Sequence, residues 1–303
     1  MSKNGIALLL TLLFIIAMTA SVGIGLKQMK NAQTSVVNDK FMTQSRMVVD
    51  DVLTILKNNS ILDKIVHDKS VEELHTFLSQ SKSLPLNISD LEIDIAVTSA
   101  RSKFNINDLT DANSTINVKR VEILKEYMSR HNVNSNFVDM LLDNMGKVKE
   151  AMLYNSSIFD DNPTLFRDFI ASLQHYNKIM QYYEQRYNDP SVEKIDAKEL
   201  FSFSSKRDDS IDLNYATAEV WQMLLGVDGQ TAQKLQNKEG SLTSFDDLGI
   251  SKMQQQHLQN FNVSFFEPYL LVKIKIRQEK KEANVRFEYD IKNKKGYNFV
   301  YEI

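Results

Sequence analysis

The strongest hydrophobic pattern is an uncharged apolar segment close to the N-terminus, residues 6–26, which is flanked by Lys3 on one side and Lys27 on the other. As an α-helix its 21 residues would span roughly 31 Å, which is enough to cross the hydrocarbon core of a bilayer. The apolar region of a cleaved signal peptide is usually shorter, and a helix at the edge of a core normally has a polar face. The pattern therefore predicts a transmembrane helix over residues 6–26, which residues 1–5 precede.

Apolar side chains continue at helical spacing beyond this segment. They recur at Val37, Phe41, Val48, Val52, Ile55 and Leu56, and neither proline nor glycine interrupts residues 26–57. Residues 27–58 are therefore expected to extend the membrane helix as an amphipathic continuation that ends near Asn59. The apolar face of this continuation would pack on a globular head, and a short coiled-coil stalk is the alternative.

Residues 264–303 alternate apolar and polar side chains with the period of a β-strand. The alternation runs through 270–276, 285–291 and 297–303, and turn-forming residues lie at 278–282 and 293–296. Such alternation predicts an antiparallel meander with one buried face. The amphipathic helix of residues 37–56 is the expected cover for that face.

The chain between these ends has mostly helical patterns. Residues 59–106 are expected to form the first part of the head, with a helix at 71–81 and a strand at 91–99. Helices are predicted at 118–130, 136–144 and 164–187, inside an α-helical insertion of residues 107–263. The predicted fold class is thus α+β: a long N-terminal membrane helix packed on a C-terminal antiparallel sheet, with a large inserted all-α domain.

The helix predicted at 164–187 carries aromatic side chains that are expected to lie in the core: Phe166, Phe169, Tyr176, Tyr182, Tyr183 and Tyr187. The preceding Asp160-Asp161-Asn162-Pro163 is expected to cap this helix. Calcium binding by the oxygen atoms of these side chains is the alternative.

Residues 209–259 predict a helix-hairpin-helix within the inserted domain. Thr217 is the expected N-cap of a helix at 218–225, and Gly226 and Gly229 would allow a tight turn with positive φ angles. Ala232 would let the second helix approach the first closely. Ser244, with Asp247 three residues later, predicts a capping box for a further helix.

Composition and charge narrow the classes of function. The chain has no cysteine, which excludes disulfides, thiolate metal sites and cysteine nucleophiles, and its five histidines show no metal-binding spacing. No phosphate-binding or nucleophile motif is present, so the chain is not expected to be an enzyme, and no motif predicts a metal or other cofactor. Residues 209–259 contain seven acidic residues and three lysines, a formal charge of −4. Because phosphate binding depends on cations, the hairpin is expected to pack against protein and not to bind nucleic acid.

Several segments, in the same order along the chain, resemble the K-type minor pseudopilins of type II secretion (the general secretion pathway protein K family). Lys3-Asn4-Gly5 followed by Ile6 resembles the site that prepilin peptidase cleaves. The phrase RSKFNINDL at 101–109 resembles an Asn-x-Asn stretch of that family. The hairpin region, with Asn214 and Thr217, resembles the family's hairpin, although Asp212 stands where asparagine is usual and Tyr215 where threonine is usual.

The resemblance implies cleavage after Gly5, so that the mature chain begins at an N-methylated Ile6. It also implies placement at a filament tip, because Leu10 stands where most pilins and pseudopilins have a glutamate that pairs with the neighbouring subunit. The protein would be a single-pass inner-membrane protein with a periplasmic head. Its partners would be prepilin peptidase, other minor pseudopilins and the major pseudopilin, whose assembly it would prime to support export across the outer membrane. Members of this family can bind calcium in the helical domain, but residues 137–149 lack the corresponding acidic cluster.

Three other functions fit part of the pattern. A membrane-anchored helix-hairpin-helix receptor for DNA uptake would need a basic hairpin, which the charge of residues 209–259 opposes. A plain anchored structural protein would keep residues 1–5. A minor pilin of a type IV pilus shares every feature used above, so the sequence leaves it open.

Overall fold

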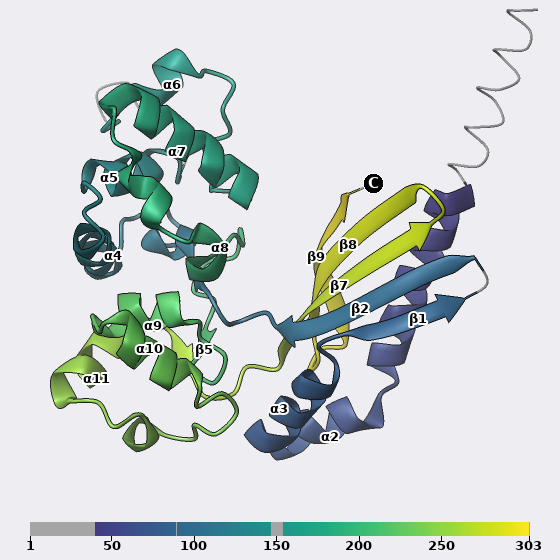
Figure 1. The fold of residues 1–303 in the computed structure, drawn as a ribbon. Helices are drawn as coiled ribbons and strands as arrows, with labels where there is room; N and C mark the ends of the chain where they lie inside the picture. The colour runs from purple at the N-terminus through teal and green to yellow at the C-terminus, as the bar shows by residue number, and fades with distance from the viewer. Residues whose placement is uncertain (1–39, 89, 147–153, 303) are drawn as a thin grey trace, which may run out of the picture.

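The computed structural model describes residues 40–88, 90–146 and 154–302, and these fold into two lobes (Figure 1). One lobe is built on an antiparallel sheet, and the other is almost entirely helical. Each lobe has its own cluster of buried apolar side chains. The observed architecture is therefore the predicted α+β class.

A single five-stranded antiparallel sheet, in the order β1-β2-β7-β8-β9, forms the first lobe. Its strands are β1 (Leu84–Ile88), β2 (Leu91–Ser99), β7 (Tyr269–Gln278), β8 (Lys281–Asp290) and β9 (Lys295–Glu302). The alternation in the sequence sets the buried face, because Val97, Val272 and Phe287 all point into one core while their neighbours along each strand face outward. The predicted strand at 91–99 and the antiparallel pairing of the predicted meander are confirmed.

A helix over residues 40–57 covers the buried face of this sheet. Phe41, Val49, Val52 and Leu56 belong to the same buried cluster as the apolar side chains of β2, β7 and β8. The helix ends at the predicted place, since Asn59 is the N-cap of α2 (Ser60–Asp68), which precedes α3 (Val71–Gln80). Among the described residues no helix has the length and apolar character needed to cross a bilayer. The predicted membrane segment, 6–26, lies outside that part of the chain.

The two edge strands differ from the sequence prediction. Strand β1 was not predicted, because its proline breaks the usual strand pattern, but an edge strand can accommodate a residue that has no N–H to donate. The apolar face predicted for the last segment is wrong: Tyr297, Phe299 and Tyr301 are 43%, 39% and 45% exposed. Helix 40–57 reaches the start of β9, where Leu53 lies against Gly296, but the register of β9 shifts at a bulge opposite Arg286 and Glu288. The side chains beyond this point remain half covered.

The helical lobe is inserted between β2 and β7, which are neighbours in the sheet. Its α-helices are α4 (Val118–Arg130), α5 (Asn136–Asp143), α6 (Ile158–Asp161), α7 (Leu173–Tyr187), α8 (Ala197–Leu200), α9 (Ala218–Leu225), α10 (Gly229–Gln236) and α11 (Lys252–Leu258). Its 3-10 helices are η1 (Ile106–Leu109), η3 (Pro190–Lys194) and η4 (Phe245–Leu248). Two short parallel pairs close the lobe at its base: β3 (Phe104–Asn105) with β4 (Phe201–Ser202), and β5 (Ile211–Asp212) with β6 (Val263–Ser264).

One predicted helix is too long. The helix expected at 164–187 begins at Leu173, because Ser172 caps it by accepting a hydrogen bond from the His175 backbone N–H. Asp160 and Asp161 lie in α6 and do not cap α7, so that expectation is also wrong. The aromatic side chains therefore divide: Tyr176 and Tyr183 of α7 are buried, whereas Phe166 and Tyr187 are exposed.

Candidate interaction site

The residues singled out in the sequence fall into two groups in the structure. Gly5, Ile6 and Leu10 lie outside the described residues. Asn214, Thr217, Gly226, Gly229 and Ala232 all lie in the part of the helical lobe that contains α9 and α10.

The side chain of Thr217 fixes the start of α9. Its hydroxyl accepts a hydrogen bond from the Val220 N–H at 3.2 Å and donates one to the Glu199 carbonyl at 2.8 Å. The same group thus caps α9 and ties it to α8, and this is the N-cap expected from the sequence.

The two glycines of the hairpin have different structural roles. Gly226 ends α9 with a φ angle of +67°, a left-handed conformation that side chains with a Cβ disfavour. Gly229 is the first residue of α10 and has no positive φ, so the expectation of a left-handed glycine there is wrong. Asp228 provides the reason, because its carboxylate caps α10 by accepting from the Thr231 N–H at 2.8 Å.

Helices α9 and α10 pack closely against each other, and Ala232 is fully buried in the lobe core with Trp221. The carboxamide oxygen of Gln236 accepts a hydrogen bond from the Ala218 N–H at 2.8 Å, which joins the end of α10 to the start of α9. The two helices therefore lie against each other, and the small side chain at 232 allows the close approach.

Asp212 and Asn214 attach this hairpin to the segments of the chain that follow it. The Asn214 amide donates to the Leu242 and Phe265 carbonyls at 2.8 and 2.7 Å, and its oxygen accepts from the Leu242 N–H. The two oxygens of Asp212 accept separately from the N–H groups of Asn214 and Glu267. An asparagine at 212 would offer one acceptor oxygen in place of two. Burial raises the pKa of Asp212 to about 7.

The outer turn of the hairpin is acidic. Gly226, Asp228, Gly229 and Gln230 are exposed there, and the carboxylate of Asp228 occupies the N-terminus of α10. The hydrogen bond from the Thr231 N–H lowers the pKa of Asp228, so this group is charged at neutral pH. A helix N-terminus otherwise attracts phosphate, and here an internal carboxylate takes that position. This geometry opposes nucleic-acid binding by the hairpin.

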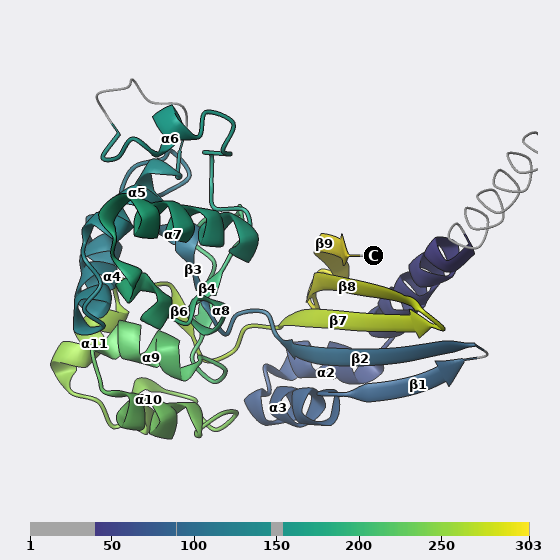
Figure 2. The same ribbon diagram turned by 45° about the horizontal axis from the view of Figure 1, so that its top comes forward.

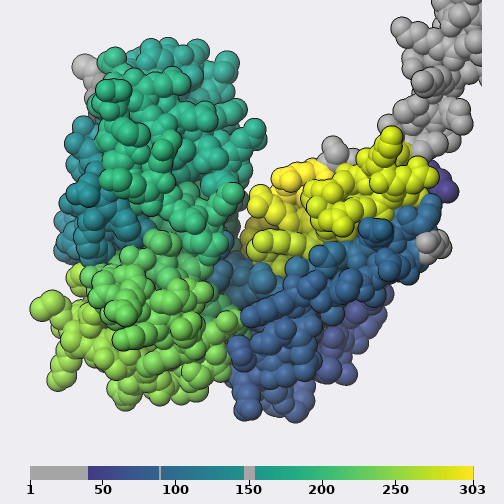
Figure 3. Space-filling view, in the orientation of Figure 1, coloured from purple at the N-terminus to yellow at the C-terminus, as the bar shows by residue number. Residues whose placement is uncertain are grey.

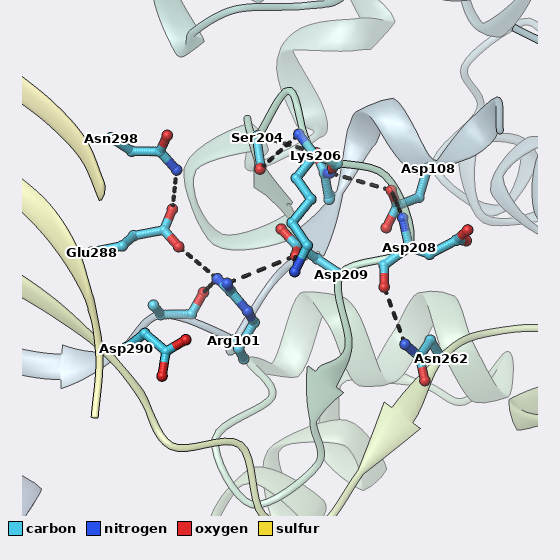
Figure 4. Close-up of polar contacts among 12 residues, drawn as sticks. Arg101, Asp108, Ser204, Lys206, Asp208, Asp209, Asn262, Glu288, Asp290 and Asn298 are labelled. Atoms are coloured by element: carbon cyan, nitrogen blue, oxygen red, sulfur yellow. Dashed lines mark hydrogen bonds and ion pairs between the residues drawn. The ribbon is translucent and has the colours of Figure 1, made fainter. Parts of the chain in front are cut away.

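The junction between the two lobes is a polar site that the sequence did not predict (Figure 4). Arg101 follows β2, and its guanidinium donates to Glu288 of β8 at 2.7 Å and lies 3.7 Å from Asp209 of the helical lobe. The guanidinium also stacks over the Tyr269 ring, 4.2 Å from its centroid. The pKa of Arg101 is raised, because attraction to Glu288 and Asp209 outweighs the desolvation of burial. One cation thus joins acidic side chains from both lobes.

The phrase at 101–109 organises the loop that carries Asp209. Asn107 is fully buried, and its amide donates to the Ile170 and Ser204 carbonyls while its oxygen accepts from the Ile170 N–H at 2.8 Å. Asn105 donates to the Lys206 carbonyl at 2.7 Å and accepts from the Ser204 N–H. The side chains of these asparagines therefore serve as hydrogen-bond partners for backbone groups that lie far away in the sequence. An asparagine in a local turn would bond only to its near neighbours.

Asp108 completes this network (Figure 4). It accepts hydrogen bonds from the Asp208 N–H at 2.8 Å and from the Asn105 amide at 3.2 Å, both at Oδ1. Burial raises the pKa of Asp108 to about 7. Arg120 donates to the Asp108 carbonyl and contacts the Asp208 carboxylate at 3.1 Å, so α4 is held to the same loop.

The described residues contain no group of three or more histidine, aspartate or glutamate side chains placed to hold a metal ion. Asp161, a residue of the alternative calcium site, instead accepts a hydrogen bond from the Tyr182 hydroxyl at 2.5 Å.

An N-terminal helix on an antiparallel sheet, with a helical lobe inserted between adjacent strands, is the architecture that the sequence resemblance implied. No protein-family model and no curated protein sequence matches the chain. Among solved structures, it is similar to a chain in the crystal structure of the GspK–GspI–GspJ complex from the type 2 secretion system of enterotoxigenic Escherichia coli. The TM-score is 0.51 at 10% sequence identity, and the match covers 86% of this chain and 99% of that chain. The resemblance to K-type minor pseudopilins is confirmed at the level of the fold.

Proposed function

We propose that this protein is a minor pseudopilin of a type II secretion machine. The observation that carries the proposal is the extent of the fold match, which covers 86% of this chain and 99% of a chain from the GspK–GspI–GspJ complex. A membrane-anchored protein with an unrelated head would not be expected to carry a large helical insertion between two neighbouring strands of such a sheet.

In the proposed mechanism, prepilin peptidase removes residues 1–5 and leaves Ile6 as the first residue of the membrane helix. Leu10 lacks the carboxylate that would pair with the N-terminus of a neighbouring subunit, so the chain occupies the tip and not the middle of the filament. Together with other minor pseudopilins it primes addition of the major pseudopilin. The head then supports export through the outer membrane.

The outward face of helix 40–57 supports this assembly. Met47 and Ile55 are 60% and 65% exposed there, while the opposite face is buried against the sheet. Exposed apolar side chains on the continuation of a membrane helix are suited to packing against the helices of neighbouring subunits. The α9–α10 hairpin serves as a protein-packing module, which agrees with its acidic turn.

The first test is the intact mass of the protein extracted from membranes, with and without the cognate prepilin peptidase. We expect a peptidase-dependent start at Ile6 carrying an N-methyl group. The Gly5→Val variant is the matched control and should keep the full mass in both strains, because it alters only the residue before the cut. A start at Met1 in the presence of the peptidase would contradict the proposal.

A second measurement tests whether the protein belongs to a secretion machine, independently of whether its N-terminus is processed. The processed chain should co-purify from detergent extracts with the other minor pseudopilins of the same cell, and its deletion should abolish export of secreted proteins. Normal export together with loss of surface pili would assign the chain to a type IV pilus instead. Salt-sensitive binding of duplex DNA by the protein would support the receptor for DNA uptake.

A further inference from the structure

The face of the sheet that points away from helix 40–57 carries a row of side chains from four strands. The strand register places Lys273 of β7 between Ala96 of β2 and Arg286 of β8, and Val300 of β9 follows Arg286. Because side chains on paired residues share a face, Lys273 and Arg286 stand side by side, with small apolar neighbours at both ends of the row.

Lys273 and Arg286 have no ion-pair partner among the residues that the structure describes. Cations further along the same face do have partners: Lys275 contacts Glu282 at 2.9 Å, and Arg277 contacts Glu282 at 3.4 Å. Glu288, the nearest acidic side chain along β8, is already held by Arg101 and by the Asn298 amide. Two exposed cations are thus left opposite each other without an ion-pair partner among the described residues.

Like charges directly opposite on neighbouring strands destabilise a sheet. A glutamine at either position would relieve this repulsion, so the arrangement has a cost for folding. Such a cost is expected where a surface is used for binding an anionic group.

These two cations line a cavity of about 360 Å³ on the outer face of the sheet. Strands β2, β7, β8 and β9 all contribute to it, because the sheet curls so that β9 rises beside β8 (Figure 2). The space-filling view shows a gap between the helical lobe and the β8–β9 part of the sheet (Figure 3), and no residue of the helical lobe lines the cavity. A volume of this size lies within the range of ligand pockets and can accept a few side chains.

We propose that this cavity binds an acidic segment of a partner protein, with carboxylate side chains paired to Lys273 and Arg286. The rest of the lining favours a peptide over a polyphosphate. Asp94 and Glu302 also line the cavity, where they would repel a densely charged polyanion, while Ala96 and Val300 offer apolar contact. A segment with separated carboxylates and apolar side chains between them matches both features.

The test uses the full-length chain in a neutral detergent and a fluorescent nine-residue peptide with alternating glutamate and valine. We expect binding in the range of about 10–500 µM by fluorescence anisotropy, weakened at least fivefold by K273Q or by R286Q. The control R277Q removes one positive charge from the same face but lies outside the cavity, so it should leave binding within about twofold. A peptide with glutamine in place of glutamate should bind at least tenfold more weakly.

A stability measurement on the same variants distinguishes a binding site from a structural pair. K273Q and R286Q should raise the Tm by about 1–2 °C, because each removes a like-charge contact. The proposal is overturned if the glutamate peptide does not bind below about 1 mM, or if the two variants bind as the native chain does. It is equally overturned if both variants lower the Tm, or if inorganic phosphate displaces the peptide at similar concentrations.

Discussion

At the scale of single residues, Asp108 shows how a buried carboxyl group couples the fold to pH. Its Oδ1 atom accepts both hydrogen bonds, and burial raises its pKa to about 7 from 3.8. Between these values the folded chain holds a proton that the unfolded chain releases. The contribution of Asp108 to stability is therefore fully present below about pH 4 and is lost as the pH rises through about 7.

The Asp108→Asn variant should remove this dependence, because an amide keeps the acceptor oxygen for both hydrogen bonds and never ionises. The native chain should lose on the order of 2–4 kcal/mol more than the variant between pH 4 and pH 8. Urea unfolding at both pH values measures the difference, and Glu92→Gln, an exposed carboxylate on β2, controls for net charge. Equal losses in the native chain and in Asp108→Asn would show that the proton is not held there.

Residues that act locally could be predicted from the sequence, and residues that act at long range could not. Thr217 and Gly226 were found because a helix cap depends on residues within one turn. The junction role of Arg101 could not be predicted because its partner Glu288 lies 187 positions away. Asn107 was singled out by the resemblance alone, and its role could not be predicted because it bonds to Ile170, 63 positions away. No local pattern separates such an asparagine from one in an ordinary turn.

At the scale of elements, the same distinction applies. Strands β2, β7 and β8 were predicted because one face is buried and the other is wet, so the sequence alternates. Strand β1 has no buried residue, and the apolar alternation of β9 lies on a partly uncovered edge. An alternating pattern predicts a strand only where one of its faces is buried. Strand β1 has no such face to produce a pattern, and β9 has the pattern although its apolar side chains remain partly exposed.

The turn between α9 and α10 offers a matched pair of glycine variants. Gly226→Ala should destabilise the protein by about 1–2 kcal/mol, because its φ of +67° is left-handed. Gly229→Ala should be neutral or stabilising by up to about 1 kcal/mol, since it is helical and the nearest side-chain atoms to an added methyl group are 3.9 Å away. Urea denaturation followed by Trp221 fluorescence reports both changes, because this tryptophan is buried in α9. Equal effects of the two substitutions would contradict the different roles assigned to these glycines.

At the scale of the whole molecule, non-covalent contacts hold the two lobes together in addition to the chain segments that connect them. Tyr215 and Phe266 pack against the sheet core from the helical side. Gly240, with a φ of +73°, lies so close to the ring of His75 in α3 that a methyl group there would collide with it. Arg101 adds the polar contact between Glu288 and Asp209. These three contacts fix the angle at which the helical lobe stands beside the sheet (Figure 2).

Arg101→Met should weaken this junction more than either lobe. Removing the cation leaves Asp209 and Glu288 desolvated with only part of their compensation, from Lys206 and Asn298. Breaking a buried ion pair in this way costs about 3–5 kcal/mol, whereas Arg277→Met, at a half-exposed pair on the same sheet, should cost less than about 1 kcal/mol. The two lobes should also unfold at different urea concentrations in this variant, because Arg101 is the only described cation that contacts acidic side chains of both lobes.

Two probes distinguish this outcome from a general loss of stability. Trp221 fluorescence follows the helical lobe alone, as the chain has one tryptophan, and far-ultraviolet circular dichroism follows both lobes. In the native chain the two urea transitions should coincide, and in Arg101→Met they should have different midpoints. Coincident transitions shifted equally would mean that Arg101 supports the lobes individually, and the docking role assigned to it would then be wrong.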